Sequence, residues 1–239
     1  MKKIGLALIA VVLCAAVLPA RVATAQQQWV EGTNYVLLDQ PQATTVPAGK
    51  VEVMEIFSYA CPFCDKFQPI VHQIEHGLPS YAQMVYLPAS FVPTEDWPMF
   101  QQAYFAAESL GIADRTHQAM YDAVWKTGQL ATIDQSTNQL KHPMPSLEDA
   151  ARYYSQLTGV SEQKFLTAAR SFGVANQMHQ ADAQILAMKV PGTPCIVVDG
   201  KYRVEMESLS SPEDVVSVVN FLVAKAHSEH LHPAARPSA

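Results

Sequence analysis

The most informative segment of the chain is Val51-Glu52-Val53-Met54-Glu55-Ile56-Phe57-Ser58-Tyr59-Ala60-Cys61-Pro62-Phe63-Cys64. Its first seven residues are largely apolar and partly β-branched, which is typical of a central strand buried on both faces. Beyond the cysteines, four apolar residues recur at helical spacing and predict one buried stripe: Phe67, Ile70, Val71 and Ile74. A C-x-x-C pair is therefore expected at the junction between a buried strand and a helix.

This placement gives the two cysteines different roles. Cys61 is expected at the N-terminal end of the helix, where unpaired N–H groups and the positive end of the helix dipole favour a thiolate. The thiolate is the nucleophile in disulfide exchange, so the position raises reactivity. Pro62 suits the first helical turn, where its missing N–H costs nothing. Cys64 lies one turn on and is the candidate resolving thiol.

The cysteine pair has two other interpretations, a structural bridge and part of a metal site. A bridge across so short a loop removes little chain entropy, so stability is a poor reason for it. A zinc site needs further ligands, yet Cys195 is the only other cysteine beyond residue 25 and the histidines are scattered. We therefore predict redox chemistry with no metal or organic cofactor, and a copper or zinc carrier remains the alternative.

Residues 1–25 are predicted to be a cleaved signal peptide. Lys2 and Lys3 precede an apolar run over residues 4–18, and small residues at 23–25 suit a signal peptidase. The run is short for a membrane span, and a lipid anchor at Cys14 fits less well because the residue before it is not small. The protein is thus expected to be exported.

Composition limits the class of partner. The chain has 239 residues and is 49% hydrophobic, which suits one sizeable globular unit or two small ones. Loss of a leader with three basic residues and no acid would change the net charge from −6 to −9. Such a surface repels phosphate backbones, so nucleic acid is not an expected partner.

The remaining pattern predicts a sheet interrupted by helices. Strands are expected at residues 34–39, 84–87, 195–198 and 202–204, the last two joined by the hairpin signal Asp199-Gly200. Between them, residues 93–189 show helical spacing and predict a bundle of about five helices, with a polar connection over 129–145. A final helix begins at Ser211-Pro212-Glu213-Asp214.

A second functional signal is Thr193-Pro194, directly before a predicted strand. Together with the upstream C-x-x-C pair it indicates a cis peptide bond. Such a bond would leave the Thr193 backbone free to pair with an extended substrate chain. An ordinary trans proline at an edge is the alternative.

The segment around Cys61 and Cys64, Thr193-Pro194 and the helical insertion together resemble the DsbA family of periplasmic dithiol oxidases, over residues 36–226. The resemblance implies an α/β, thioredoxin-like fold with an inserted all-helical domain. It assigns residues 26–92 and 190–226 to the thioredoxin-like domain and 93–189 to the insertion. Residues 227–239 are polar and contain proline, so a flexible tail is expected there. It also implies disulfide donation to unfolded exported proteins in the periplasm, and reoxidation by a membrane DsbB-type, quinone-linked partner.

Two residues depart from the best-known members of that family, which carry histidine at the position of Phe63 and an acid at that of Gln68. Phenylalanine brings no charge or hydrogen bond to the thiolate, so a milder oxidant is expected. Glu55 matches the family's buried acid and is a candidate proton acceptor for Cys64. A solvated acid at a sheet edge is its alternative interpretation.

Other candidates remain open at this stage. Cys195 is expected to be a small buried residue, or else a regulatory thiol. Histidines near the C-terminus could bind metal but suit a solvated tail: His227, His230 and His232. Three aromatic residues are candidates to flank a peptide groove: Tyr59, Phe91 and Trp97.

A rival of the same class is an isomerase or reductase. Such proteins usually need a dimerisation domain, and residues 26–47 are too few to form one, so an oxidase that is monomeric or weakly associating is favoured. The sequence leaves the reduction potential, the clients and the identity of the reoxidant undetermined.

Phe63→His is expected to lower the pKa of Cys61, because an imidazolium beside the sulfur stabilises the thiolate. The thiolate's ultraviolet absorbance, titrated against pH in both proteins, measures this. An unchanged or higher pKa in the variant would refute the interpretation of Phe63.

Overall fold

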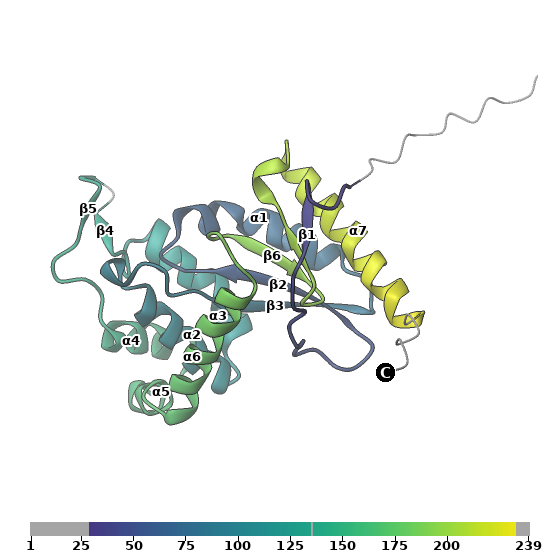
Figure 1. Cartoon of the computed structure of the whole chain (residues 1–239). Coiled ribbons are helices and arrows are strands. Elements are labelled where there is room, and N and C mark those ends of the chain that lie inside the picture. The colour runs from purple at the N-terminus through teal and green to yellow at the C-terminus, as the bar shows by residue number, and fades with distance from the viewer. Residues whose placement is uncertain (1–28, 135, 233–239) are drawn as a thin grey trace, which may run out of the picture.

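A five-stranded sheet forms the centre of the molecule (Figure 1). The computed structural model describes residues 29–134 and 136–232. The strand order is β1-β7-β6-β2-β3, with β2 and β3 parallel and the other neighbours antiparallel. The strands are β1 (Tyr35–Leu37), β2 (Val51–Phe57), β3 (Ala82–Pro88), β6 (Cys195–Val198) and β7 (Tyr202–Val204). The predicted mixed α/β architecture is confirmed.

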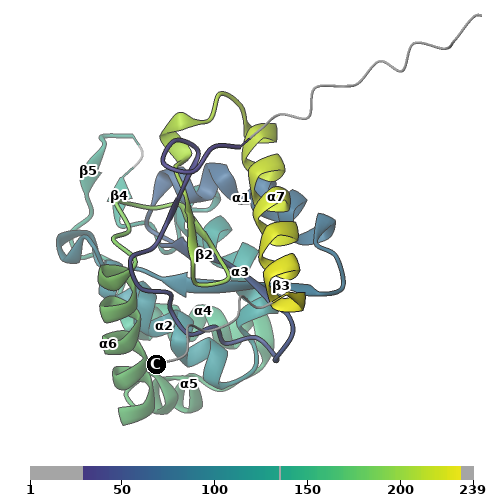
Figure 2. The same cartoon turned by 45° about the vertical axis from the view of Figure 1, so that its right-hand side comes forward.

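Helices α1 (Pro62–Gly77) and α7 (Pro212–Leu231) cover one face of the sheet, as Figures 1 and 2 show. Successive side chains of a strand point to opposite faces, so β2 serves two cores at once. Val51 and Val53 pack towards these helices, while Met54 and Ile56 pack on the other side. All seven residues of β2 are buried, as the sequence predicted for a strand covered on both faces.

The second face is covered by the helical insertion. Its helices are α2 (Trp97–Ser109), α3 (Ala113–Tyr121), α4 (Leu147–Thr158), α5 (Glu162–Ala169) and α6 (Phe172–Ala187). A π-helical turn, Asp122–Lys126, continues α3. The apolar core runs without a break from the sheet into this bundle. The predicted helical region between β3 and β6 is therefore present.

Local signals account for several helix ends. Ser146 and Asp149 form a reciprocal capping box at the start of α4. Gly159 ends the same helix with φ of 76°, a left-handed conformation that glycine adopts without strain. Ser211 accepts a hydrogen bond from the Asp214 N–H and caps α7, as its sequence predicted.

Two segments differ from expectation. The connection at 129–145 contains a short hairpin of β4 (Ile133–Asp134) and β5 (Gln139–Leu140). The expected flexible tail is wrong for residues 227–231, which continue α7. His227 stacks on Tyr81 with ring centroids 3.7 Å apart, and His230 lies 3.0 Å from the Asp199 carboxylate. These tertiary partners are invisible in local composition.

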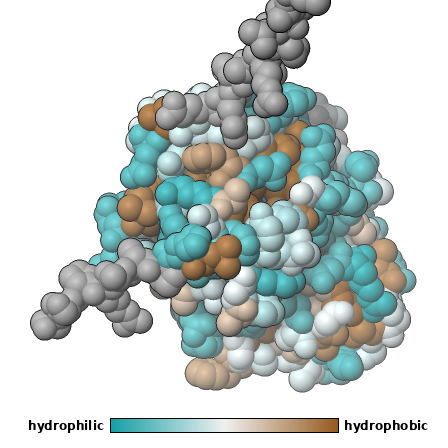
Figure 3. Space-filling view, turned by 90° about the vertical axis from the view of Figure 1, so that its right-hand side faces the viewer, coloured by the Kyte–Doolittle hydropathy of each residue, from teal (hydrophilic) through white to brown (hydrophobic). Residues whose placement is uncertain are grey.

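The predicted leader and residues 233–239 lie outside the described residues. Among the residues that are described, no helix is both long and apolar enough to cross a membrane. Figure 3 shows one face of the molecule, where hydrophilic residues are interrupted by separate hydrophobic patches.

Leu222→Ala is expected to lower the free energy of unfolding by about 2–5 kcal/mol, because it leaves a cavity between α7 and the sheet. Leu231→Ala is the matched control on the same helix; its side chain is 63% exposed, so a change within about 0.5 kcal/mol is expected. Urea denaturation of both variants tests this. Equal losses would mean that α7 is not packed as described.

Candidate active site

Cys61 caps the N-terminus of α1. Its backbone is extended, with φ of −85° and ψ of 116°, and Pro62 is the first helical residue. The Cys64 N–H donates to the Cys61 sulfur at 3.4 Å, so the helix end presents a donor to the reactive atom. The predicted placement of the pair is confirmed, and both residues are free thiols in this structure.

The two thiols have opposite electrostatic environments. The pKa of Cys61 is lowered to about 6, chiefly by a hydrogen bond from the Cys64 thiol, with further help from Thr193 and from backbone N–H groups against the cost of burial. Burial raises the pKa of Cys64 well above its ordinary value, and the neighbouring Cys61 raises it further. At neutral pH the pair therefore holds one thiolate and one thiol.

Glu55 lies under this pair on β2 and is fully buried. Burial raises its pKa to about 8, against a smaller opposing effect of Gln68. The Gln68 amide donates weakly to Glu55 Oε1 and to the Cys64 carbonyl oxygen, both at 3.4 Å, and Glu55 Oε2 contacts no donor among the described residues. The interpretation of Glu55 as a solvated edge acid is wrong; the carboxyl is mainly protonated at neutral pH.

The Thr193–Pro194 peptide bond is cis, as predicted. Strand β6 follows it and pairs with β2 through Ile56 and Cys195, which brings the loop beside the helix end. The Cys61 thiol lies 3.4 Å from the Thr193 carbonyl oxygen. Cys195 is buried and its pKa is raised to about 12 by burial, so it fits the expected small buried residue.

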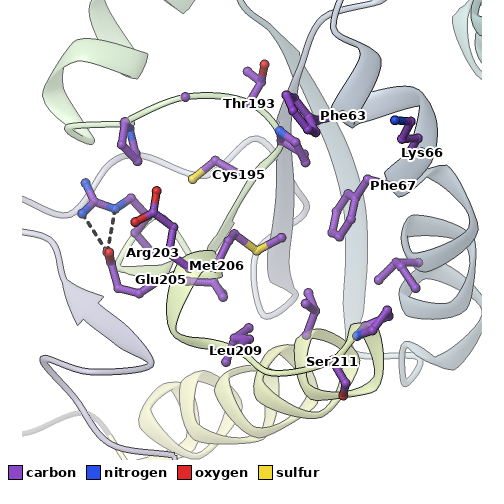
Figure 4. A pocket seen from close by; sticks show the side chains of 18 of the residues that line it. Phe63, Lys66, Phe67, Thr193, Cys195, Arg203, Glu205, Met206, Leu209 and Ser211 are labelled. Carbon is purple, nitrogen blue, oxygen red and sulfur yellow. Dashed lines mark hydrogen bonds and ion pairs between the residues drawn. The ribbon is translucent and has the colours of Figure 1, made fainter.

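A groove of about 800 Å³ opens beside the cysteines (Figure 4). The α1 residues Phe63 and Phe67 form one wall, the Thr193–Pro194 loop a second, and Met206 and Leu209 the far end. Phe63 is 67% exposed, so its ring is available to a molecule in the groove.

The aromatic residues expected at a peptide groove lie elsewhere. Tyr59 and Trp97 are buried in the core between the sheet and the insertion, so that expectation is wrong for them. Phe91 is partly exposed and packs near Trp97, with ring centroids 6.2 Å apart. Tyr59 and Trp97 pack in the core because burying a large aromatic side chain is favourable, and they are therefore not available to contact a peptide.

Sequence reasoning missed the support behind the Cys61 turn. The Tyr59 hydroxyl and His117 Nδ1 lie 3.0 Å apart, and the Trp125 indole donates to the Tyr59 carbonyl oxygen at 2.8 Å. Burial lowers the pKa of His117 to about 3, so the imidazole is neutral and holds Tyr59 in place without charge. These contacts join residues 58 and 66 positions apart, and no local signal marks them.

In residues 29–134 and 136–232, no group of three or more His, Cys, Asp or Glu side chains is arranged to hold a metal ion. His227 and His230 make the ring and carboxylate contacts described above.

A thiolate held at a helix N-terminus, opposite a cis-proline loop and above a buried acid, defines a thiol:disulfide oxidoreductase of thioredoxin-like fold. Curated relatives agree. A DsbA thiol:disulfide interchange protein from Pseudomonas aeruginosa is 32% identical over 198 residues, covering 82% of this chain and 85% of the relative. One from Azotobacter vinelandii is 31% identical and covers 84% of each.

Solved structures give the same answer. The oxidoreductase DsbA from Xylella fastidiosa superposes with a TM-score of 0.71 at 29% identity, covering 83% of this chain and 98% of that one. The Pseudomonas aeruginosa DsbA crystal structure gives 0.68 at 30% identity, covering 84% and 95%. No protein-family model matches the sequence. The chain belongs to the DsbA family and is a dithiol oxidase whose redox centre is its C-x-x-C pair.

The raised pKa of Glu55 predicts a stability difference that depends on pH. Between about pH 4.5 and about pH 8 the folded protein retains a proton that the unfolded chain, with an ordinary glutamate pKa of 4.5, has already lost. The contribution of Glu55 to the free energy of unfolding is therefore complete below about pH 4.5 and is lost as the pH rises towards about 8. The unfolding free energy of the reduced wild type should therefore fall relative to Glu55→Gln across that window. Parallel pH curves for the two proteins would show that Glu55 is not buried as described.

Proposed function

We propose that this chain oxidises the thiols of newly exported, unfolded proteins in the periplasm, with Cys61 as the sulfur attacked by the client. The observation that carries the proposal is the position of Cys61 at the first turn of α1, with the Cys64 N–H directed at its sulfur. A helix end that stabilises a thiolate makes Cys61 a good leaving group.

The proposed exchange has two steps. A client thiolate attacks Cys61 of the Cys61–Cys64 disulfide; a client–Cys61 bond forms, the intramolecular bond breaks, and Cys64 departs with the electron pair. The second client thiolate then attacks its own sulfur in the mixed disulfide, which forms the client disulfide and releases Cys61 as a thiolate. The client loses two electrons and the enzyme pair gains them.

In this scheme Glu55 gives a proton to Cys64 and takes it back. Cys64 is buried where an anion is costly, so its departure as a thiolate requires a proton, and a protonated Glu55 below it can provide one. During reoxidation Cys64 attacks a mixed disulfide and gives up its proton, and Glu55 then acts as the acceptor. Gln68 orients the carboxyl through its hydrogen bond to Oε1.

The groove beside the pair is the proposed client site. An extended client segment would pair with the Thr193 backbone and lay apolar side chains against the exposed ring of Phe63, with Met206 and Leu209 further along. Such contacts suit unfolded chains because main-chain pairing does not depend on sequence. Pro62 and Phe63 are then the residues that modulate the pKa of Cys61, and Phe63 also shapes the entrance of the groove.

The cellular setting completes the proposal. The predicted leader supports export, and family membership supports a periplasmic location, reoxidation by a membrane DsbB-type partner and activity as a monomer. We further propose that residues 26–92 with 190–226 act as the redox domain, and that residues 93–189 act as the inserted domain that buries its second face.

Cys64→Ser is expected to accumulate mixed disulfides when mixed with a disulfide-bonded client, because Cys61 attacks the client and no second thiol releases it. Cys195→Ser is the matched control and should turn over normally, since Cys195 is buried with a raised pKa. Non-reducing electrophoresis detects the trapped species. Trapping through a residue other than Cys61 would contradict the assigned roles.

Oxidase and isomerase activities separate on one client. The oxidised wild type should refold reduced ribonuclease rapidly and scrambled ribonuclease slowly. The reverse preference would favour the isomerase.

A further inference from the structure

A second groove, of about 770 Å³, lies along the free edge of the sheet. Strand β3 forms its floor, and α1, α2, α3 and α6 contribute side chains to its walls. None of the residues assigned to the redox pair or to the cis-proline loop lines it. We call it the β3-edge groove.

The β3-edge groove is acidic. Glu75 from α1, Glu108 from α2 and Asp114 from α3 are exposed around it, and its lining contains no Lys, Arg or His. Burial first, and then the nearby Asp114 charge, raise the pKa of Glu108. The carboxylates of the β3-edge groove therefore lack a cationic partner in its lining, and a bound cation would relieve the repulsion between them.

The floor of the groove offers unpaired backbone. In a parallel ladder the N–H and C=O of one residue point the same way, and alternate residues point to opposite sides. The Tyr81 carbonyl accepts from Val51 and the Ala89 N–H donates to Phe57, which directs odd-numbered residues of β3 towards β2. The backbone groups of Met84 and Tyr86 consequently point outwards at the open edge.

Two aromatic side chains of α2 also line the groove. Tyr104 is 3% exposed and forms part of its wall. Phe105 lies next to it in the lining and adds an aromatic surface beside the carboxylates.

We propose that the β3-edge groove binds an extended, basic segment of a partner polypeptide. The segment adds to the sheet as a strand on β3, its backbone pairing with Met84 and Tyr86, and it places Lys or Arg side chains among Glu75, Glu108 and Asp114. Both the unpaired edge and the charge of the walls match this occupant, because main-chain pairing gives affinity and charge gives selectivity. The site is separate from disulfide exchange.

The test uses the full mature chain and a fluorescently labelled, cysteine-free peptide of about seven residues, a typical strand length, in which lysine alternates with valine and threonine. Fluorescence polarisation is expected to show saturable binding that falls with salt. The double variant Glu108→Gln with Asp114→Asn should weaken binding roughly tenfold, since two screened ion pairs are lost. Glu162→Gln, which removes an exposed charge on α5, should leave it unchanged.

Three further arms locate the peptide and its backbone. A peptide N-methylated at alternate residues should bind at least tenfold more weakly, because it cannot pair with an edge. Phe63→Ala should not affect binding; loss in that variant alone would place the peptide in the groove beside the cysteines and overturn the proposal. Tighter binding after removal of residues 233–239 would make the chain's own C-terminus the occupant and would also overturn it.

The remaining outcomes are equally decisive. Absence of binding by the folded wild type, or equal affinity for a peptide with glutamate in place of lysine, rejects a basic segment as the ligand. Matching thermal unfolding midpoints for the groove variants and wild type show that a lost affinity reflects the groove itself.

Discussion

The contact between the first turn of α1 and the Cys61 sulfur is the interaction on which this molecule depends. A donor from Cys64 and the helix end stabilise negative charge on one sulfur, while burial keeps its neighbour protonated. The reduced pair is thereby favoured, and the oxidised pair readily passes its disulfide to a client. Much of the surrounding fold holds this helix end in place.

The sheet positions the other participants relative to that helix end. Strand β2 leads directly into the cysteine turn and carries Glu55 beneath it, while antiparallel β6 brings Thr193 to the opposite side. The insertion seals the second face and supplies His117 and Trp125, which hold Tyr59. The insertion therefore does more than add size: it fixes the approach to Cys61.

Burial sets the chemical character of the site more than charge pairing does. Within the part of the chain that the structure describes, no cationic side chain contacts Glu55, and the raised pKa of that carboxyl comes chiefly from loss of water. The groove beside the exposed Phe63 combines apolar side chains with charged residues of both signs, whereas the charged residues that line the β3-edge groove are all acidic. Two grooves of similar volume thus differ in charge, because only the β3-edge groove lacks a basic side chain in its lining.

The sequence by itself determined the strand at Val51–Phe57, the helix after it, the C-x-x-C pair at their junction and the cis-proline loop, because each depends on local spacing, capping or turn chemistry. Tertiary structure alone decided that Glu55 is buried, that Tyr59 belongs to the core, and that α7 continues through His227. Burial and long-range contacts such as Tyr81 with His227 depend on which distant segments meet. The spacing of residues within one segment does not specify which distant segments it will contact.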